Sequence, residues 1–172
     1  GGGVIGCELG QMFARVGSAV TICCRTRLLP EMEPEVSAAL QAALEEEGIT
    51  VCSGIGYQKI EEVQGQINLY CENKDGEHVI SAEKLLVATG RRANTASLGL
   101  QDVGVEILRN GGVKVDERMQ TSNPNIYAAG DVTGTDMFVY MAAYGAKLAA
   151  RNALNSNSLS YDNSAMPAVV FT

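Results

Sequence analysis

The feature that most constrains the fold of this chain is a glycine motif at its first residues, Gly1-Gly2-Gly3-Val4-Ile5-Gly6. The spacing G-x-G-x-x-G is typical of the turn between a β-strand and the α-helix that follows it. In such a turn Gly1 makes the tight bend, Gly3 lets the backbone approach a pyrophosphate, and Gly6 lets the helix pack closely on the strand. The sequence begins at the turn, so we expect the chain to be part of a longer enzyme.

The residues after the motif follow helical and strand patterns in alternation. Helical spacing over 7–16 is followed by an apolar run at 19–24, which has the length of a strand buried on both faces. A second helix is expected between Pro34 and Gly48, before a strand over 49–53. This order predicts an α/β, Rossmann-like dinucleotide-binding domain that lacks its first strand.

From residue 57 to residue 80 the period of the apolar residues changes to two. Together with the hairpin signal Asp75-Gly76, this alternation predicts an antiparallel β-meander in place of a crossover helix. The sole histidine, His78, lies in the meander far from any motif, and a structural or solvated role is favoured over catalysis. A further strand is expected over 84–90.

The second half of the chain has shorter elements. Strands are expected over 112–116 and 125–131, each bounded by turn-forming residues. The segment 137–154 is apolar nearly all round and predicts a long helix buried between layers. A polar loop is expected over 155–163, and residues 166–172 have the composition of another strand.

Composition excludes several classes of protein. The net charge of −7 counts against general nucleic-acid binding, and no apolar run approaches the length of a membrane span. The five cysteines form no C-x-x-C or metal-ligand spacing, and their odd number suits a reducing, cytoplasmic compartment. We expect them to be mainly buried apolar side chains. Cys23 and Cys24 are adjacent on an expected strand and point to opposite faces, so they are poorly placed to form a disulfide.

The cofactor preference is predicted by the residues that follow the second strand. An acidic residue about 20 positions after the glycines would bind the ribose 2′-hydroxyl and select NAD. Here Arg25 and Arg27 occupy that region and no acid is present. Two guanidinium groups suit a 2′-phosphate, which predicts NADPH over NADH. The alternative is that these arginines are solvated loop charges.

Four features occur in a fixed order along the chain: the glycine motif with Glu8 after it, ATGR at 88–91, SNPNIYAAGD at 122–131 and PAVVFT at 167–172. Taken together they resemble the pyridine nucleotide–disulfide oxidoreductases over essentially the whole chain. Within that family, the segment FVYMAAY at 138–144 most resembles the mercuric reductases.

The resemblance implies a division into domains. Residues 1–88 would form the NAD(P)-binding domain, 89–158 the C-terminal half of an FAD-binding domain, and 159–172 the start of a dimerisation domain. The parent enzyme would be a homodimer. Its redox disulfide would precede this chain and a further cysteine pair would follow it, so we expect the chain alone to be inactive.

The resemblance also implies roles for individual residues. Glu8 would approach the contact between flavin and nicotinamide as a catalytic group, and Gly90 would allow close approach of the dinucleotide. Asp131 would accept a hydrogen bond from the FAD ribityl chain, and Val139 would direct its backbone N–H at the flavin pyrimidine. From the residues alone, Glu8 could equally be a solvated helix charge, and Asp131 could belong to an ordinary turn.

The expected function of the parent is to pass hydride from NADPH to FAD and then electrons to a cysteine pair, reducing Hg(II) to Hg(0). A dihydrolipoamide dehydrogenase, or another disulfide reductase acting on a disulfide substrate, is the alternative within the family. For the chain by itself, the alternative is a dinucleotide-binding module without catalysis.

Overall fold

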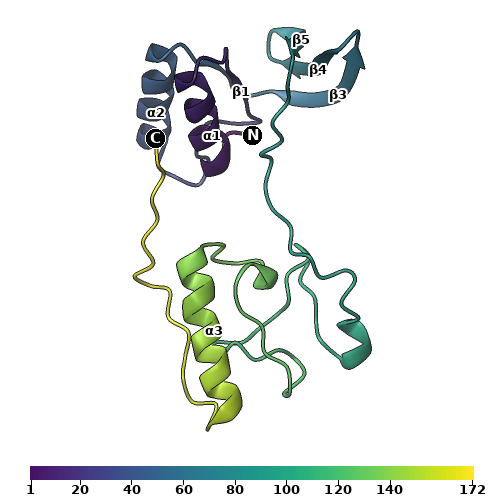
Figure 1. Cartoon of the computed structure of the whole chain (residues 1–172), viewed down its shortest axis with the longest axis vertical. Helices are drawn as coiled ribbons and strands as arrows, with labels where there is room; N and C mark the ends of the chain where they lie inside the picture. The colour runs from purple at the N-terminus through teal and green to yellow at the C-terminus, as the bar shows by residue number, and fades with distance from the viewer. The chain divides into compact units, whose positions relative to one another are not determined.

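The structure is a computed structural model that describes all 172 residues. The chain divides into two compact units, which are described separately (Figure 1). The first unit comprises residues 1–90 together with 169–172, and the second comprises residues 91–168. The domain boundaries expected from the sequence stay a prediction.

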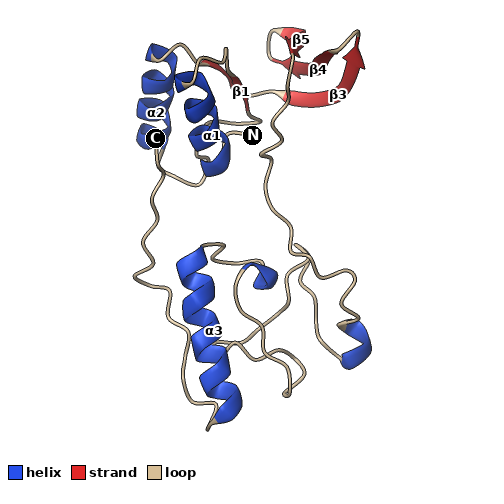
Figure 2. Cartoon of the chain, viewed as in Figure 1, coloured by secondary structure: helices blue, strands red, loops and turns tan.

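The first unit begins with alternating helices and strands (Figure 2). Its α/β part contains α1 (Val4–Arg15), β1 (Thr21–Cys23), α2 (Pro34–Glu46) and β2 (Thr50–Cys52). The two strands pair in parallel, with Thr21 opposite Thr50 and Cys23 opposite Cys52. The predicted α/β fold with a parallel sheet is therefore confirmed.

Helix α1 packs through its small residues rather than its large apolar ones. Gly6, Cys7 and Gly10 are buried, whereas Met12 and Phe13 are 46% and 41% exposed. A Cβ atom at Gly10 would lie 3.0 Å from Ile22 Cδ1, so glycine lets the helix lie close to β1. Close approach of helix and strand thus decides which face of α1 is buried.

The core of the α/β part lies between the helices and the two-stranded sheet. Its buried side chains come from both helices, β1 and the loops: Cys7, Ile22, Cys24, Leu28, Leu29, Leu44 and Ile49. The hydroxyl of Ser37, in the first turn of α2, donates a 2.6 Å hydrogen bond to the Leu28 carbonyl. This buried bond ties α2 to the loop that follows β1.

The predicted meander is confirmed. It consists of three antiparallel strands in the order β3 (Gly56–Val63), β4 (Gln66–Asn73) and β5 (Gly76–Ala82). The turn between β4 and β5 ends at Gly76, whose φ of +116° favours glycine. The ring of His78 is exposed, and its Nε2 lies 2.8 Å from Asn73 Oδ1 across this turn, which agrees with a structural role.

The strand expected over 84–90 is wrong. This segment makes no backbone hydrogen bond to another part of the chain, and Leu85, Leu86 and Val87 are 41–69% exposed. A strand exists only where its N–H and C=O groups pair with a neighbour, and an apolar composition does not supply one.

The second unit is built around α3 (Val139–Leu154), which confirms the predicted long helix. The expectation that this helix is buried between layers is wrong, because only one face of it packs on the unit and Val139 and Leu154 are each 84% exposed. Two 3₁₀ turns, η1 (Gln101–Val103) and η2 (Asp131–Thr133), are the other regular elements of this unit. The strands expected over 112–116 and 125–131 are reduced to isolated bridges such as Val115 with Thr121. Residues 155–163 form the predicted loop, whereas 166–172 pair with no strand, so the strand expected there is wrong.

The side chain of Asn152 joins α3 to two loops. It is 2% exposed, its Nδ2 donates to the carbonyls of Arg118 and Leu159 at 3.0 and 2.8 Å, and its Oδ1 accepts from the Leu159 N–H at 2.9 Å. Met119, Leu148 and Ala149 form the small apolar core beside it.

No helix in the chain is both long enough and apolar enough to cross a membrane.

Candidate functional site

The glycine motif forms a turn in which each glycine has a different steric role. A Cβ atom at Gly1 would overlap the carbonyl of Ala88, and one at Gly6 would overlap the carbonyl of Gly1. A Cβ atom at Gly3, by contrast, would have no atom within 4 Å. Gly1 and Gly6 are therefore required by packing, whereas the space at Gly3 is open to a ligand.

The N-terminus of α1 can receive an anion at this open space. The helix begins at Val4 with Gly3 as its N-cap, no side chain caps it, and its first turn contains no acidic residue. Its first N–H groups therefore keep their capacity to donate, and the helix dipole favours negative charge there. These features fit the pyrophosphate of a dinucleotide.

The loop after β1 gives its two arginines different surroundings. The guanidinium of Arg27 donates hydrogen bonds of 2.9 Å to the carbonyls of Pro30 and Met32, which fixes the shape of the loop. Arg25 is exposed and has neither a hydrogen bond nor an ion pair. The sequence does not distinguish the two arginines. In the structure the guanidinium of Arg27 is bound to carbonyl groups, whereas that of Arg25 is available to a ligand.

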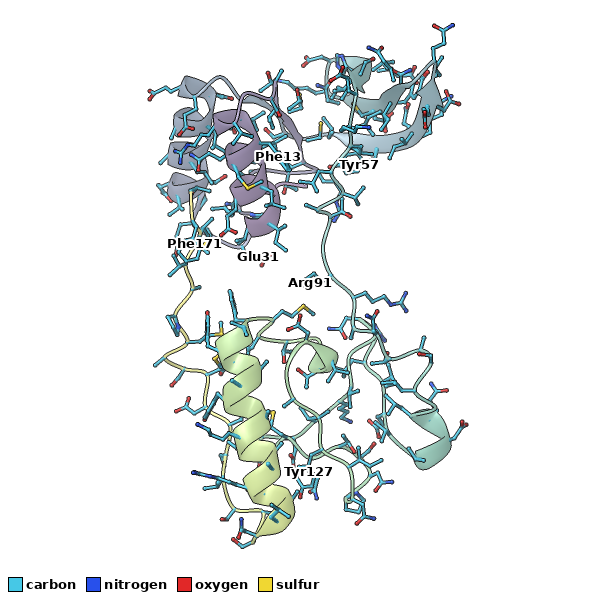
Figure 3. The ribbon with its side chains drawn as sticks, in the orientation of Figure 1. Phe13, Glu31, Tyr57, Arg91, Tyr127 and Phe171 are labelled. Atoms are coloured by element: carbon cyan, nitrogen blue, oxygen red, sulfur yellow. The ribbon has the colours of Figure 1, made fainter.

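Glu8 lies on α1 near the glycine turn and is half-buried. Its Oε1 accepts a 3.0 Å hydrogen bond from the backbone N–H of Phe171, which Figure 3 labels. No sequence pattern indicates this contact, because the two residues are 163 positions apart. The catalytic role expected for Glu8 stays a prediction.

The residues expected to contact FAD lie mainly in the second unit. Asp131 begins η2 directly after Gly130, whose φ of +81° favours glycine, and its Oδ2 lies 3.9 Å from the guanidinium of Arg91. Both side chains are about half exposed, so this ion pair contributes little stability and leaves the carboxylate accessible.

Val139 begins α3 and is 84% exposed, and no side chain caps the helix. The free N–H groups there fit the negative charge that a reduced flavin gathers on its pyrimidine ring. Gly90, at the end of the first unit, has a φ of +123° and no atom within 4 Å of a Cβ position, so it can also lie close to a ligand. The cofactor roles of Asp131, Val139 and Gly90 stay predictions.

The cysteines of this chain are poor nucleophiles. All five are free, and Cys7, Cys24 and Cys71 are buried. Burial is the main cause that raises the pKa of Cys7 and the pKa of Cys23 to about 11. Both thiols are therefore protonated at neutral pH, and neither is suited to act as a nucleophile.

Known proteins are similar to this chain in sequence and in structure. The chain is 43% identical to a mercuric reductase from Staphylococcus aureus and 39% identical to a dihydrolipoyl dehydrogenase from Thermus scotoductus. It is covered completely in both alignments but spans only 32% and 38% of those proteins. The Cu(II) complex of the HOCl-induced flavoprotein disulfide reductase RclA from Escherichia coli matches 95% of the chain, with a TM-score of 0.85 and 30% identity, over 36% of its own length.

The family model for pyridine nucleotide-disulphide oxidoreductases matches residues 1–150. That match includes the glycine turn, the Arg25 loop, Asp131 and most of α3. The chain therefore belongs to the pyridine nucleotide–disulphide oxidoreductase family, whose enzymes use FAD and NAD(P)H.

Proposed function

We propose that this chain contributes the NADPH site and part of the FAD site of a flavoenzyme that reduces Hg(II). The observation that carries the NADPH part is the glycine turn, in which only Gly3 is open, together with the unpartnered guanidinium of Arg25. The chain spans about a third of the length of the curated relatives it matches, and the remaining parts of the two sites are proposed to come from outside it.

The residues of the first unit bind and select the dinucleotide. The N–H groups at the start of α1 donate to the pyrophosphate, and the absence of a side chain at Gly3 permits that approach. Arg25 pairs with the 2′-phosphate, and Arg27 holds the loop that presents Arg25. No acidic residue, which would repel the phosphate, is present at residues 24–27, directly after β1.

The residues of the second unit orient the flavin. Asp131 accepts a hydrogen bond from the ribityl chain, and the N–H groups at the start of α3 face the pyrimidine ring, with Val139 first among them. FAD, when bound, accepts hydride from NADPH and passes electrons on to a cysteine pair. In this proposal Glu8 lies near the nicotinamide and positions it through its carboxylate.

Hg(II) is the proposed acceptor because mercuric reductases recur among the relatives, at 42–44% identity in Staphylococcus aureus, Bacillus cereus and Streptomyces lividans. The second candidate is lipoamide reduction, since a dihydrolipoyl dehydrogenase is 39% identical. The exposed guanidinium of Arg25 favours an NADPH-linked enzyme over an NAD-linked one. We further propose that the enzyme is a homodimer and works in the cytoplasm, where reducing conditions keep its five free cysteines as thiols.

The substrate is tested with the whole enzyme. We expect purified enzyme to consume NADPH when Hg(II) is added in the presence of excess thiol, and to release Hg(0). NADH-linked turnover of lipoamide is measured beside it as the alternative activity. Lipoamide turnover without consumption of NADPH by Hg(II) would overturn the substrate while leaving the family unchanged.

The cofactor assignment is tested with two arginine variants. Arg25→Ala removes one charge-assisted hydrogen bond worth about 1.5–3 kcal/mol, so NADPH affinity should fall about 10- to 150-fold while NADH affinity stays unchanged. Arg27→Ala is the matched control, because it removes an equal charge from a side chain that is bonded to the carbonyls of the loop, so it should lower NADPH affinity less than Arg25→Ala does and leave NADH affinity unchanged. Equal losses of NADPH and NADH affinity in Arg25→Ala would refute the role of this residue.

A further inference from the structure

Two cysteines face each other at the end of the parallel sheet. Cys23 is the last residue of β1, Cys52 is the last residue of β2, and the two are register partners. The strands are still hydrogen-bonded at this point, because the N–H of Cys24 donates to the carbonyl of Cys52 at 2.9 Å. The spacing of paired strands, about 4.8 Å, therefore holds between these two residues.

The side chains of Cys23 and Cys52 lie on the same face of the sheet. Ile22, Cys24 and Val51 belong to or pack on the core that faces the helices. Because successive side chains of a strand point to opposite faces, Cys23 and Cys52 point away from that core. Both are half-buried rather than buried, so solutes can reach them.

Both thiols are free in this structure and form no disulfide. A strand spacing of about 4.8 Å lies within the range of Cα separations that a disulfide can span, so the pair is kept as thiols by reducing conditions. A linear thiolate–metal–thiolate bridge has different requirements. Two metal–sulfur bonds of about 2.3 Å span about 4.6 Å, which matches the separation of the strands.

The surroundings restrict the number of ligands to two. A further thiol, that of Cys71 in β4, has its Sγ turned to the His78 carbonyl at 3.8 Å within the meander. The hydroxyl of Tyr57, labelled in Figure 3, donates to the Cys23 carbonyl at 2.8 Å and offers the pair no further ligand. No group of three His, Cys, Asp or Glu side chains in the chain could hold a metal ion together.

We propose that Cys23 and Cys52 form a two-coordinate site for a soft cation that prefers linear geometry, the class that contains Cu(I) and Hg(II). Thiolate ligands select soft cations, and the absence of a third ligand excludes tetrahedral zinc. On binding, each thiol loses its proton to solvent as its sulfur bonds to the metal, so two protons are released and no electron is transferred. The inference does not rest on the proposed function, because it uses only the register of β1 and β2.

The first test measures Cu(I) affinity of the 172-residue chain without oxygen, by competition with the chromophoric chelator bathocuproine disulfonate. Cys23→Ser and Cys52→Ser should each weaken binding by about 100-fold or more, because linked ligands gain at least that factor. The double variant should be no weaker than either single variant, since one missing sulfur already ends the bridge. Cys71→Ser is the matched control and should bind as the unchanged chain does.

Two results would overturn the site. Independent thiols would make the losses of Cys23→Ser and Cys52→Ser multiply in the double variant, and a site at Cys71 would make Cys71→Ser as weak as they are. A second measurement needs no variant: X-ray absorption of the chain with one equivalent of Hg(II) should show two sulfur neighbours. One or three sulfur neighbours would contradict the proposal for Hg(II). An unchanged Cu(I) affinity of Cys52→Ser would contradict the proposal for Cu(I).

Discussion

The open space at Gly3 leads to a prediction that separates binding from folding. Gly3 has φ −78° and ψ 179°, an extended conformation that alanine adopts without strain, and a Cβ atom there would meet nothing within 4 Å. Alanine removes some unfolded-chain entropy, a gain of about 0.4–1 kcal/mol, but is a poorer N-cap than glycine by a similar amount. Gly3→Ala should therefore leave the free energy of unfolding within about 1 kcal/mol.

The same substitution should weaken dinucleotide binding strongly. The new methyl group would occupy the place at which the pyrophosphate approaches the first N–H groups of α1. Losing one charge-assisted hydrogen bond costs about 1.5–3 kcal/mol, which is about 10- to 150-fold in affinity. NADPH and NADH should weaken by the same factor, because both carry the pyrophosphate.

The assay combines urea unfolding, followed by circular dichroism, with calorimetric titration of NADPH and NADH into the 172-residue chain. Gly6→Ala is the matched contrast, because its Cβ atom would overlap the Gly1 carbonyl and should lower stability by about 1–3 kcal/mol. A Gly3→Ala chain that binds NADPH as tightly as the unchanged chain would refute the placement of the pyrophosphate at Gly3.

Two further predictions concern the second unit. Asn152→Ala should lower the free energy of unfolding by about 3 kcal/mol, since it leaves the backbone groups of Arg118 and Leu159 without their buried partner, as urea unfolding would show. Burial and the hydrogen bond to Asp136 raise the pKa of Tyr161 to about 12, so a tyrosinate titration should show a phenol that ionises well above the ordinary value of about 10. Because this pKa is raised above the ordinary value of about 10, the stability that Tyr161 contributes is complete below pH 10 and is lost from about pH 10 to 12. Tyr161→Phe should remove that part of the decline, and an unchanged decline would contradict the assignment.

The parts of the fold that could be predicted from the sequence depend on local patterns. Pro34 in the first turn of α2 and the hairpin turn at Gly76 specify their conformations within a few residues. The glycine motif is partly local in the same way, because the carbonyl of Gly1 leaves no room for a Cβ atom at Gly6. These elements are found where the sequence places them.

The expected strands that the structure lacks would each have needed a neighbouring strand to pair with. The segments 84–90 and 166–172 have strand composition, but neither pairs with a neighbour. The sequence pattern also does not show which face of α1 is buried, since small residues such as Gly10 pack on β1 while Phe13 is exposed. Strand pairing and close packing depend on tertiary contacts, which the composition of a segment does not predict.

The sequence indicates which residue types the candidate site contains, but it does not show which of their side chains are already hydrogen-bonded within the protein. Arg25 and Arg27 are equivalent in sequence, and only the conformation of residues 30–32 shows that Arg27 is bound to carbonyl groups. The contact of Glu8 with the backbone of Phe171 is likewise set by the fold.

The most direct test of the central claim is calorimetric titration of the 172-residue chain with NADPH and with NADH under the same conditions. The account predicts that NADPH binds at least about 10-fold more tightly, the lower bound for one charge-assisted hydrogen bond to the 2′-phosphate. Equal affinities, or tighter binding of NADH, would contradict the assignment of Arg25 and of the chain as an NADPH-binding module.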